Sequence, residues 1–255
     1  MYSVSAIIPT YNDADRLALA IESVLDQTYE INEIIIVDDC SDDNPEEVVA
    51  EYSDDRIRFE SHTKNQGGAV ARNTGIEIAT SEYIAFLDAD DEWKPNKIEI
   101  QVTELQSRSD EWIAAYCGVQ NDRDVFSNLG DWLAKAIGFR DSNPTREGST
   151  EVIREILRMN LYMSTSSLLV KREIITAIDG FDEQFQRHQD WEFLIRVLKE
   201  GKLAYIDEPL VIKHGTGRPS AAVHDDAKLL FLEKFDEEIS ELEAGGEEIT
   251  HLHKL

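Results

Sequence analysis

Residues 83–93, YIAFLDADDEW, join an apolar run directly to three aspartates. The run is apolar and partly aromatic over five residues, which is the composition of a buried strand. Asp88, Asp90 and Asp91 then follow within four positions, and carboxylates so close together repel one another. A buried strand that ends in such a group predicts an α/β fold with a functional site beyond the strand ends.

A second apolar run ends in the same way. Residues 33–37, EIIIV, include four β-branched apolar residues and are followed by Asp38 and Asp39. Strand-like and helix-like segments alternate along residues 4–87, which predicts βαβ units and a mostly parallel, Rossmann-like sheet covered by helices on both faces. The predicted strands are 4–8, 33–37, 57–60 and 83–87, and the predicted helices are 15–27, 45–52 and the segment after 65.

The second part of the sequence is less regular. Residues 121–149 are polar and have no strong period, which predicts a long connection. We predict helices at 151–159 and 190–200 and a strand at 165–170. Apolar residues recur at helical spacing near the C-terminus, and this stripe fits either a helix packed on the body or a homodimer interface. Its members are Leu229, Leu232, Phe235, Ile239 and Leu242.

Composition excludes several classes of protein. The chain has 255 residues, of which 52 are acidic and 25 basic, and its formal net charge is −27. A nucleic-acid partner selects for Lys and Arg and is therefore not expected. Acids spread along the whole chain fit a salt-adapted, halophilic enzyme as well as an ordinary acidic one.

The sequence also bears on where the protein works. No apolar run approaches the ~20 residues of a transmembrane segment, and the N-terminus does not have the pattern of a signal peptide. Two cysteines are too few for a disulfide framework. We therefore expect a cytoplasmic protein, and peripheral contact with the inner face of a membrane stays open.

The two acidic strand ends are expected to meet. In a parallel α/β sheet, ligands bind beyond the carboxyl ends of the strands, where both groups of aspartates would lie. Closely spaced carboxylates suit Mg²⁺ or Mn²⁺, which keep several waters and bridge substrate phosphates. A divalent cation between these carboxylates and a diphosphate would neutralise the group at 88–91. The plainer alternative is a set of solvated loop and helix-cap residues.

Longer motifs carry a resemblance. In order and spacing they are similar to those of the family 2 glycosyltransferases, and the resemblance covers roughly residues 3–215. It implies the GT-A fold and an inverting transfer of a sugar from a nucleoside-diphosphate donor. The motifs are SAIIPTYN (5–12), IIIVDDCSDD (34–43), NQGGAVARNTGIEIATSEYIAFLDADDEWKPNKIEIQ (65–101), GFDEQF (180–185) and RHQDWEFLIRVLKEGKLAYIDEPLVIKH (187–214).

The resemblance implies a nucleotide-sugar site at the ends of the first strands. The turn with Pro9 and Tyr11, together with Asp39, would hold the nucleotide base, because a ring offers a stacking face and a carboxylate accepts a bond from a base N–H. Arg72 would pair with the diphosphate or fix a neighbouring carboxylate. Cys40 stands where the family usually has Gly, a residue that tolerates a positive φ.

The resemblance also implies a metal on the Asp-x-Asp motif. Asp88 would contact the ribose or the metal, Asp90 would bind the metal, and Asp91 is expected to cap the next turn. His214 is a further candidate ligand, with a structural role as its alternative. The cofactor would be Mn²⁺ or Mg²⁺.

An inverting transfer needs one general base. A single carboxylate takes the proton from the acceptor hydroxyl as that hydroxyl attacks the sugar. The resemblance implies the aspartate of a Glu-Asp pair that begins a helix, and the pair here is Gln189-Asp190. A helix N-terminus favours an ionised carboxylate, so Asp190 suits the role, with an N-cap as the alternative.

These inferences lead to one function and a division of the chain. Residues 1–120 are expected to bind the nucleotide sugar, 121–224 to bind the acceptor and supply the base, and 225–255 to form an acidic helical extension. The enzyme would move a sugar from a UDP- or GDP-linked donor to a hydroxyl of a glycan or lipid-linked acceptor.

Two alternatives remain from the sequence. One is a nucleotidyltransferase that makes sugar nucleotides, and the other is a non-catalytic sugar-nucleotide-binding protein. The first would need a loop rich in glycine and basic residues after the first strand, whereas residues 9–16, PTYNDADR, have no glycine. The presence of both Asp90 and Asp190 argues against the second.

Overall fold

The computed structural model describes residues 2–121, 146–158, 160–161, 163–214 and 221–246. The predicted connection at 121–149 lies almost wholly outside the described residues. The strands are β1 (Val4–Thr10), β2 (Glu33–Asp38), β3 (Ile57–Ser61), β4 (Tyr83–Phe86), β5 (Asp91–Trp93), β6 (Trp112–Asn121), β7 (Leu169–Lys171) and β8 (Lys202–Lys213). The helices are α1 (Ala14–Leu25), α2 (Pro45–Val49), α3 (Gly68–Ile78), α4 (Lys97–Gln106), α6 (Thr150–Leu157), α7 (Arg172–Ala177), α8 (Gln189–Glu200), α9 (Ala221–Lys234) and α10 (Asp236–Ala244), and a 3₁₀ turn lies at Thr165–Ser167.

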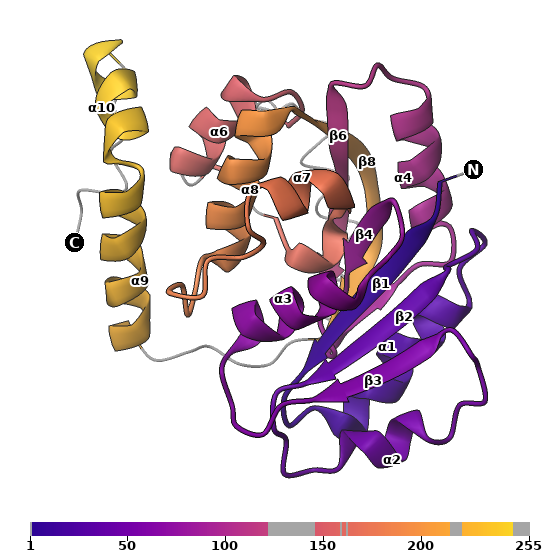
Figure 1. The fold of residues 1–255 in the computed structure, drawn as a ribbon. Coiled ribbons are helices and arrows are strands. Elements are labelled where there is room, and N and C mark those ends of the chain that lie inside the picture. The colour runs from indigo at the N-terminus through magenta and orange to yellow at the C-terminus, as the bar shows by residue number, and fades with distance from the viewer. Residues whose placement is uncertain (1, 122–145, 159, 162, 215–220, 247–255) are drawn as a thin grey trace.

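One sheet of eight strands runs through the described part of the molecule (Figure 1), in the order β3-β2-β1-β4-β7-β6-β8-β5. Strands β3, β2, β1 and β4 are parallel to one another, and β6 is parallel to β8. Strand β7 is antiparallel to both β4 and β6, and the edge strand β5 is antiparallel to β8. The predicted α/β architecture with a mostly parallel sheet is confirmed.

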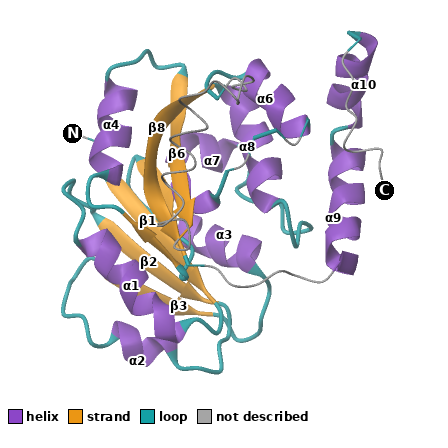
Figure 2. Ribbon diagram, turned by 180° about the vertical axis from the view of Figure 1, so that it is seen from behind, coloured by secondary structure: helices purple, strands orange, loops and turns teal. Residues whose placement is uncertain are grey.

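Helices cover both faces of the sheet (Figure 2). Helices α1, α2 and α4 pack on one face, and α3, α6, α7 and α8 pack on the other. Every residue of β2 is buried: Ile34 and Ile36 face the first layer, and Ile35 and Val37 face the second. The continuous apolar run in the sequence follows from this, because a strand between two helical layers has no solvent-facing side.

The register brings the ends of three parallel strands to one edge. Strand β1 lies between β2 and β4, with Thr10 paired to Asp38 and Ile7 paired to Phe86. The turn after β1, Asp39 after β2 and Asp88 after β4 therefore follow one another along the carboxyl edge of the sheet, where ligands bind in such folds.

The predicted strand at 165–170 is half wrong. Residues Thr165–Ser167 form a 3₁₀ turn, and only then does β7 begin. The Ser167 hydroxyl donates to the carbonyl oxygen of Ser164 at 2.6 Å. Local serine bonds of this kind compete with the sheet ladder, which explains why three polar residues curl before the apolar ones pair.

The C-terminal helices pack on the body, as one of the two interpretations of the stripe predicted. Phe231 and Phe235 are 1 % exposed and Ile239 is 5 % exposed, and all three belong to the core that includes α8. Figure 1 shows α9 and α10, in yellow, running beside α8. Leu229 faces solvent, and a homodimer through these helices stays a prediction.

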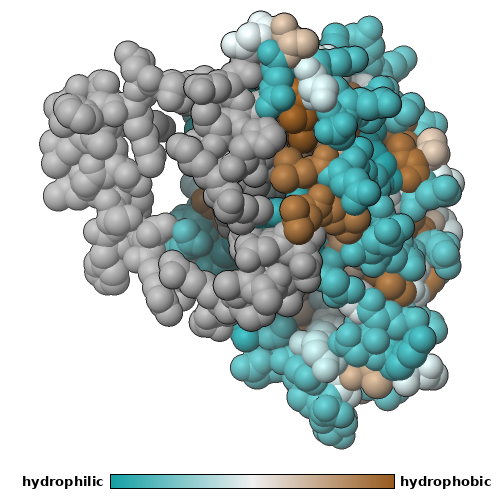
Figure 3. Space-filling model, turned by 90° about the vertical axis from the view of Figure 1, so that its left-hand side faces the viewer, coloured by the Kyte–Doolittle hydropathy of each residue, from teal (hydrophilic) through white to brown (hydrophobic). Residues whose placement is uncertain are grey.

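The described surface is mainly hydrophilic on the face that Figure 3 shows, with smaller apolar patches between polar residues. The large apolar side chains that stand exposed are Tyr11, Leu19 and Leu229. Within the described ranges, no helix combines the length and the apolar composition that a membrane crossing requires.

Candidate active site

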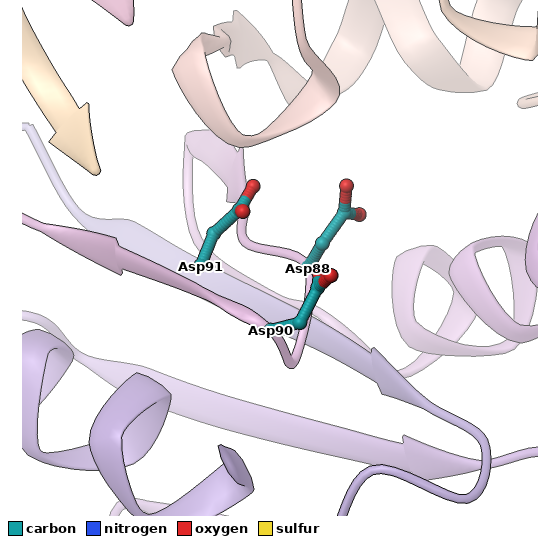
Figure 4. Close-up of side chains that lie close together, drawn as sticks. All are labelled: Asp88, Asp90 and Asp91. Atoms are coloured by element: carbon teal, nitrogen blue, oxygen red, sulfur yellow. The ribbon is translucent and has the colours of Figure 1, made fainter. Parts of the chain in front are cut away.

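Three aspartates meet beyond the end of β4 (Figure 4). Asp88 and Asp90 lie in the loop after β4, and Asp91 begins β5. One carboxylate oxygen from each residue lies within 4.8 Å of the other two. The motif in the sequence is therefore a single acidic cluster in space, and we use that name for these three residues.

Basic side chains from distant segments partly neutralise the acidic cluster. At the end of β8, Lys213 Nζ lies 3.0 Å from Asp91 Oδ2 and 3.8 Å from Asp88 Oδ2. Arg16 Nη1, on α1, lies 3.6 Å from Asp90 Oδ2. Arg16 and Lys213 were not predicted at this site, and they add positive charge beside the aspartates without a metal.

Asp91 is the most buried member of the acidic cluster, at 1 % exposure. Its Oδ2 accepts bonds from Ser166 Oγ at 2.6 Å and Lys213 Nζ at 3.0 Å. Its Oδ1 is buried and has no hydrogen-bond partner among the described residues. Burial and the nearby Asp88 charge raise the pKa of Asp91 to about 6. The prediction that Asp91 caps the turn is wrong, because its side chain turns inward to Ser166 and Lys213.

Asp88 keeps its charge despite its surroundings. Burial by itself would raise the pKa of Asp88, but the charges of Arg72 and Lys213 and the hydrogen bonds from Arg72 and Ser166 outweigh burial. The pKa of Asp88 therefore lies below its ordinary value, and its carboxylate is ionised at neutral pH.

Arg72 connects the acidic cluster with the start of α8. Its Nη2 donates to Asp88 Oδ1 at 2.6 Å, and its Nη1 donates to Gln189 Oε1 at 2.9 Å. The guanidinium carbon lies 5.5 Å from the centre of the Phe181 ring. Gly68 leaves room for this arrangement, since a Cβ there would lie only 3.0 Å from Arg72 Nη1. Of the two roles left open for Arg72, the fixing of a carboxylate is the one observed.

Asp190 is the second residue of α8, at the helix N-terminus that the sequence predicted. Burial raises the pKa of Asp190 to about 6, although the backbone N–H of Trp191, 3.0 Å from Oδ1, and the charge of Arg72 oppose this. A carboxylate with this pKa is mostly ionised at pH 7 and still accepts a proton readily. Its neighbour Gln189 joins it to the network of Arg72.

Asp39 is engaged by its own chain. Its Oδ1 accepts from the backbone N–H of Gln66 at 2.9 Å and lies 2.8 Å from His62 Nδ1. Its Oδ2 accepts from the N–H of Gly67 at 2.6 Å, and His62 Nε2 lies 2.9 Å from Thr74 Oγ1. Asp39 thus anchors the loop before α3, and its contact with a nucleotide base stays a prediction. His62 was not among the predicted site residues, because it lies in none of the motifs.

The turn after β1 leaves an aromatic ring free to stack. Tyr11 is 46 % exposed, and Pro9 pairs with Val37 within the sheet. Cys40, which follows Asp39, has a φ of +66°. The turn thus keeps the left-handed conformation that glycine adopts most readily, although a cysteine occupies the position.

His214 directly follows β8 and is next to Lys213 in the sequence, but its side chain contacts Glu92. Its Nε2 lies 2.5 Å from Glu92 Oε2. Within the described residues, the group of possible metal ligands comprises the three aspartates alone. Metal binding by His214 stays a prediction. Lys213 and Ser166 were not among the predicted site residues, because only their place in the fold brings them to Asp91.

The acidic cluster fits a divalent cation. Its donors are carboxylate oxygens, which Mg²⁺ and Mn²⁺ prefer, and they converge within 4.8 Å. The buried Oδ1 of Asp91 also lacks a partner among the described residues, and such an atom is costly to leave unsatisfied. A cation bound here would supply that partner.

Comparison with known proteins gives consistent matches. The family model described as glycosyl transferase family 2 matches residues 5–155. The amylovoran biosynthesis glycosyltransferase AmsB of Erwinia amylovora is 33 % identical over 220 residues, which are 83 % of this chain and 69 % of that protein. The Escherichia coli protein named UDP-Glc:alpha-D-GlcNAc-diphosphoundecaprenol beta-1,3-glucosyltransferase WfgD is 28 % identical over 206 residues, which are 81 % of this chain and 74 % of that protein.

A solved structure shares the fold. The mannosyltransferase PcManGT from Pyrobaculum calidifontis, in complex with GDP-Man and Mn²⁺, superposes with a TM-score of 0.67 at 19 % identity. The match covers 94 % of this chain and 64 % of that one. The eight-stranded curled sheet with flanking helices is therefore the GT-A fold that the resemblance implied.

Proposed function

Because the chain belongs to glycosyl transferase family 2, we propose that it moves a sugar from a nucleoside-diphosphate donor to an acceptor hydroxyl with inversion at the sugar carbon. One observation carries the proposal. Asp88, Arg72 and Gln189 form a continuous hydrogen-bonded chain from the acidic cluster to the residue before Asp190. A transferase of this kind needs such proximity, because the leaving diphosphate and the attacking hydroxyl meet at one carbon.

Asp190 is the proposed general base. It takes the proton from the acceptor hydroxyl while the hydroxyl oxygen bonds to the sugar carbon and the diphosphate departs. The sugar passes through a state that resembles an oxocarbenium ion, as in glycosidases. The pKa of about 6 supports this role, since the carboxylate is ionised at neutral pH.

Asp88, Asp90 and Asp91 are the residues that would hold Mn²⁺ or Mg²⁺, and His214 stays in the proposal as a further ligand. When bound, the cation would offset the negative charge that develops on the departing diphosphate. Lys213, within 3.8 Å of Asp88, adds positive charge on the same side. The complex of PcManGT with Mn²⁺ supports the choice of manganese.

The proposed donor and acceptor follow from the substrates that appear in the names of similar proteins. WfgD is named for UDP-Glc and a diphosphoundecaprenol-linked acceptor, and PcManGT was solved with GDP-Man. We therefore assign a UDP- or GDP-linked donor, bound near Pro9, Tyr11 and Asp39, and a hydroxyl acceptor in glycan or polysaccharide assembly. Residues 1–120 would bind the donor, 121–224 would bind the acceptor and supply the base, and 225–255 would form the helical extension.

The decisive experiment is a thermal-shift series with UDP-glucose and GDP-mannose, each with and without Mn²⁺. A ligand at a hundred times its Kd stabilises a protein by about 2.7 kcal/mol, which such a series detects. We expect one nucleotide sugar to raise the melting temperature, and to raise it more with Mn²⁺. Release of nucleoside diphosphate on addition of acceptor would then demonstrate transfer. Release of pyrophosphate from a nucleoside triphosphate and a sugar phosphate would instead identify a nucleotidyltransferase.

The matched variant for this experiment is Asp90→Asn. It keeps the size of the side chain and removes one charged ligand, so the metal-dependent part of the shift should disappear while the melting temperature of the free protein stays close to that of the unmodified chain. If donor affinity is the same with and without metal in both proteins, neither Asp90 nor the cation takes part in donor binding.

A further inference from the structure

A carboxylate close to the proposed base is completely buried. Glu192, two residues after Asp190 in the first turn of α8, has 0 % exposure. Arg196, one turn further along the same helix, donates to both Glu192 oxygens, at 2.5 and 2.7 Å. A buried carboxylate with one cation on its own helix is partly neutralised. Arg196 also donates to the carbonyl oxygen of Ile178 at 2.5 Å, which ties α8 to the segment after α7 but not to the C-terminal helices.

A second cation reaches Glu192 from the C-terminal helices. Lys234, the last residue of α9, lies with its Nζ 2.7 Å from Glu192 Oε1 and 2.5 Å from Asp182 Oδ2. Asp182 follows Phe181, over whose ring the Arg72 guanidinium lies. One ammonium group therefore joins α9, the first turn of α8 and the loop that supports Arg72.

Aromatic packing joins the same elements. The Trp191 ring, next to Asp190, meets the Phe231 ring of α9 edge-on, with centroids 6.2 Å apart. It also stacks with the ring of His188, the residue before α8, with centroids 4.7 Å apart. Both residues that follow Asp190 thus contact α9, Trp191 through its ring and Glu192 through its charge.

From these contacts we infer that Lys234 is a positioning residue for the transfer reaction. Through Lys234, α9 holds the start of α8 against the loop at residues 181–182. The inference rests on the proposed role of Asp190 as base. A base must lie within hydrogen-bond reach of the proton it removes. A displacement of roughly 1 Å costs about a hundredfold in rate, so a contact that fixes the first turn of α8 bears directly on turnover.

The test compares three variants of the full chain. Lys234→Met removes the ammonium but keeps an unbranched side chain, and Lys234→Arg restores a cation that reaches both carboxylates. Lys228→Met is the matched control, because Lys228 lies on the same helix and makes no ion pair among the described residues. The first measurement, hydrogen exchange at the backbone amides of residues 191 and 192, needs no donor. We expect exchange to become about tenfold faster in Lys234→Met and to stay unchanged in the other two.

The second measurement is release of UDP from UDP-glucose in the presence of Mn²⁺, with water as the acceptor in place of the glycan hydroxyl. We expect kcat of Lys234→Met to fall by about tenfold to about a hundredfold at an unchanged KM for UDP-glucose, and Lys234→Arg to restore most of the rate. A structural role alone would instead speed exchange throughout the chain and alter KM together with kcat.

The outcomes separate this inference from the proposed function. Unchanged exchange at the start of α8 in Lys234→Met contradicts the inference that α9 holds α8 in place. A rate that Lys234→Arg fails to restore contradicts it as well. If the unmodified protein releases no UDP from UDP-glucose in water, the exchange measurement alone decides whether α9 holds α8.

Discussion

At the scale of single residues, the proposed reaction depends on the pH at which one carboxylate ionises. Burial raises the pKa of Asp190 to about 6, so this base is protonated below that pH and ionised above it. We expect kcat to rise about tenfold per pH unit in the acid range and to level off above about pH 6. Steady-state kinetics from about pH 4.5 to about pH 8 measures this profile.

The matched substitution is Asp190→Asn, which keeps the shape of the side chain. It should lower kcat by about 10² to 10⁴ and abolish the acid limb, because the amide does not accept the proton. The Kd for donor, measured by calorimetry, should stay unchanged, since the proposed contact of Asp190 is with the acceptor. A variant that transfers sugar at a near-normal rate would exclude Asp190 as the base.

Lys213 gives a second prediction at this scale. Its ammonium lies between Asp88 and Asp91, so its positive charge opposes a divalent cation at the same carboxylates. Lys213→Met should bind Mn²⁺ at least about tenfold more tightly in a titration without nucleotide. Lys94→Met is the control, because the Lys94 ammonium bonds to Gln120 instead. Equal or weaker binding by Lys213→Met would contradict the competition.

The sequence predicted some of these residues and missed others for a physical reason. Asp88, Asp90 and Arg72 lie within one continuous motif, and Asp190 begins a helix, so local patterns were enough to single them out. Lys213 lies 122 residues from Asp91. Their contact exists because β5 and β8 are antiparallel with Asp91 opposite Lys213, and a pairing between such short and distant segments leaves no mark in local spacing.

At the scale of elements, the turn after β2 holds a strained residue. Cys40 has a φ of +66°, a conformation that costs a residue with a side chain about 1 to about 3 kcal/mol. Glycine avoids this cost but loses more backbone entropy. We expect Cys40→Gly to raise the free energy of unfolding by about 1 kcal/mol, as measured in urea.

The control for this turn, Gly67→Ala, should change the free energy of unfolding in the opposite direction. Gly67 has a φ of +96° and precedes α3, so Gly67→Ala adds a side chain where the backbone disfavours one. That variant should be less stable than the unmodified chain. A destabilised Cys40→Gly would mean that contacts of the thiol outweigh the strain of the turn.

Helix α4 carries a lysine in the core, which gives a pH prediction. Lys97 is 0 % exposed; burial lowers its pKa from 10.5 to about 8. Its partners are Gln101 Oε1 at 2.8 Å and the face of Trp93. The folded state therefore binds fewer protons than the unfolded state between pH 8 and pH 10.5, and the contribution of Lys97 to stability rises with pH over that window.

The measurement is the difference in unfolding free energy between Lys97→Met and the unmodified chain. As pH rises from about 8 to about 10.5, this difference should move in favour of the unmodified chain by at most about 3 kcal/mol. Taking the difference removes the contribution of the tyrosines, which titrate in the same range in both proteins. A difference that does not vary with pH would show that Lys97 has its ordinary pKa.

Elements were predictable where the hydrophobic period is clear. The predicted helix at 15–27 corresponds to α1 (Ala14–Leu25), and the predicted strand at 33–37 corresponds to β2 (Glu33–Asp38). Strand β5 has three residues, of which two are acidic, so it has neither the length nor the alternation of a strand. It pairs because β8 lies beside it, a tertiary cause that local sequence cannot reveal.

At the scale of the whole molecule, the net charge of −27 governs the response to salt. Repulsion between like charges acts over about 30 Å at 0.01 M salt and about 3 Å at 1 M. We expect the melting temperature to rise between 0.1 M and about 2 M KCl, because screening relieves that repulsion over the whole surface. A parallel series in NaCl tests whether screening or a specific ion is responsible. A flat or falling melting temperature would mean that the excess of acidic residues is that of an ordinary acidic protein and is not an adaptation to salt.

The position of β5 at the sheet edge has a consequence for synthesis on the ribosome. Asp91 opens β5, and its ammonium partner Lys213 follows 122 residues later. A growing chain lengthens by ~5 to ~20 residues per second, so Asp91 is added roughly 6 to 24 seconds before Lys213. Strands β1 to β4 pair only with one another and with β7 and can associate earlier. The nascent chain therefore carries the acidic cluster without its ammonium partner until Lys213 has been added.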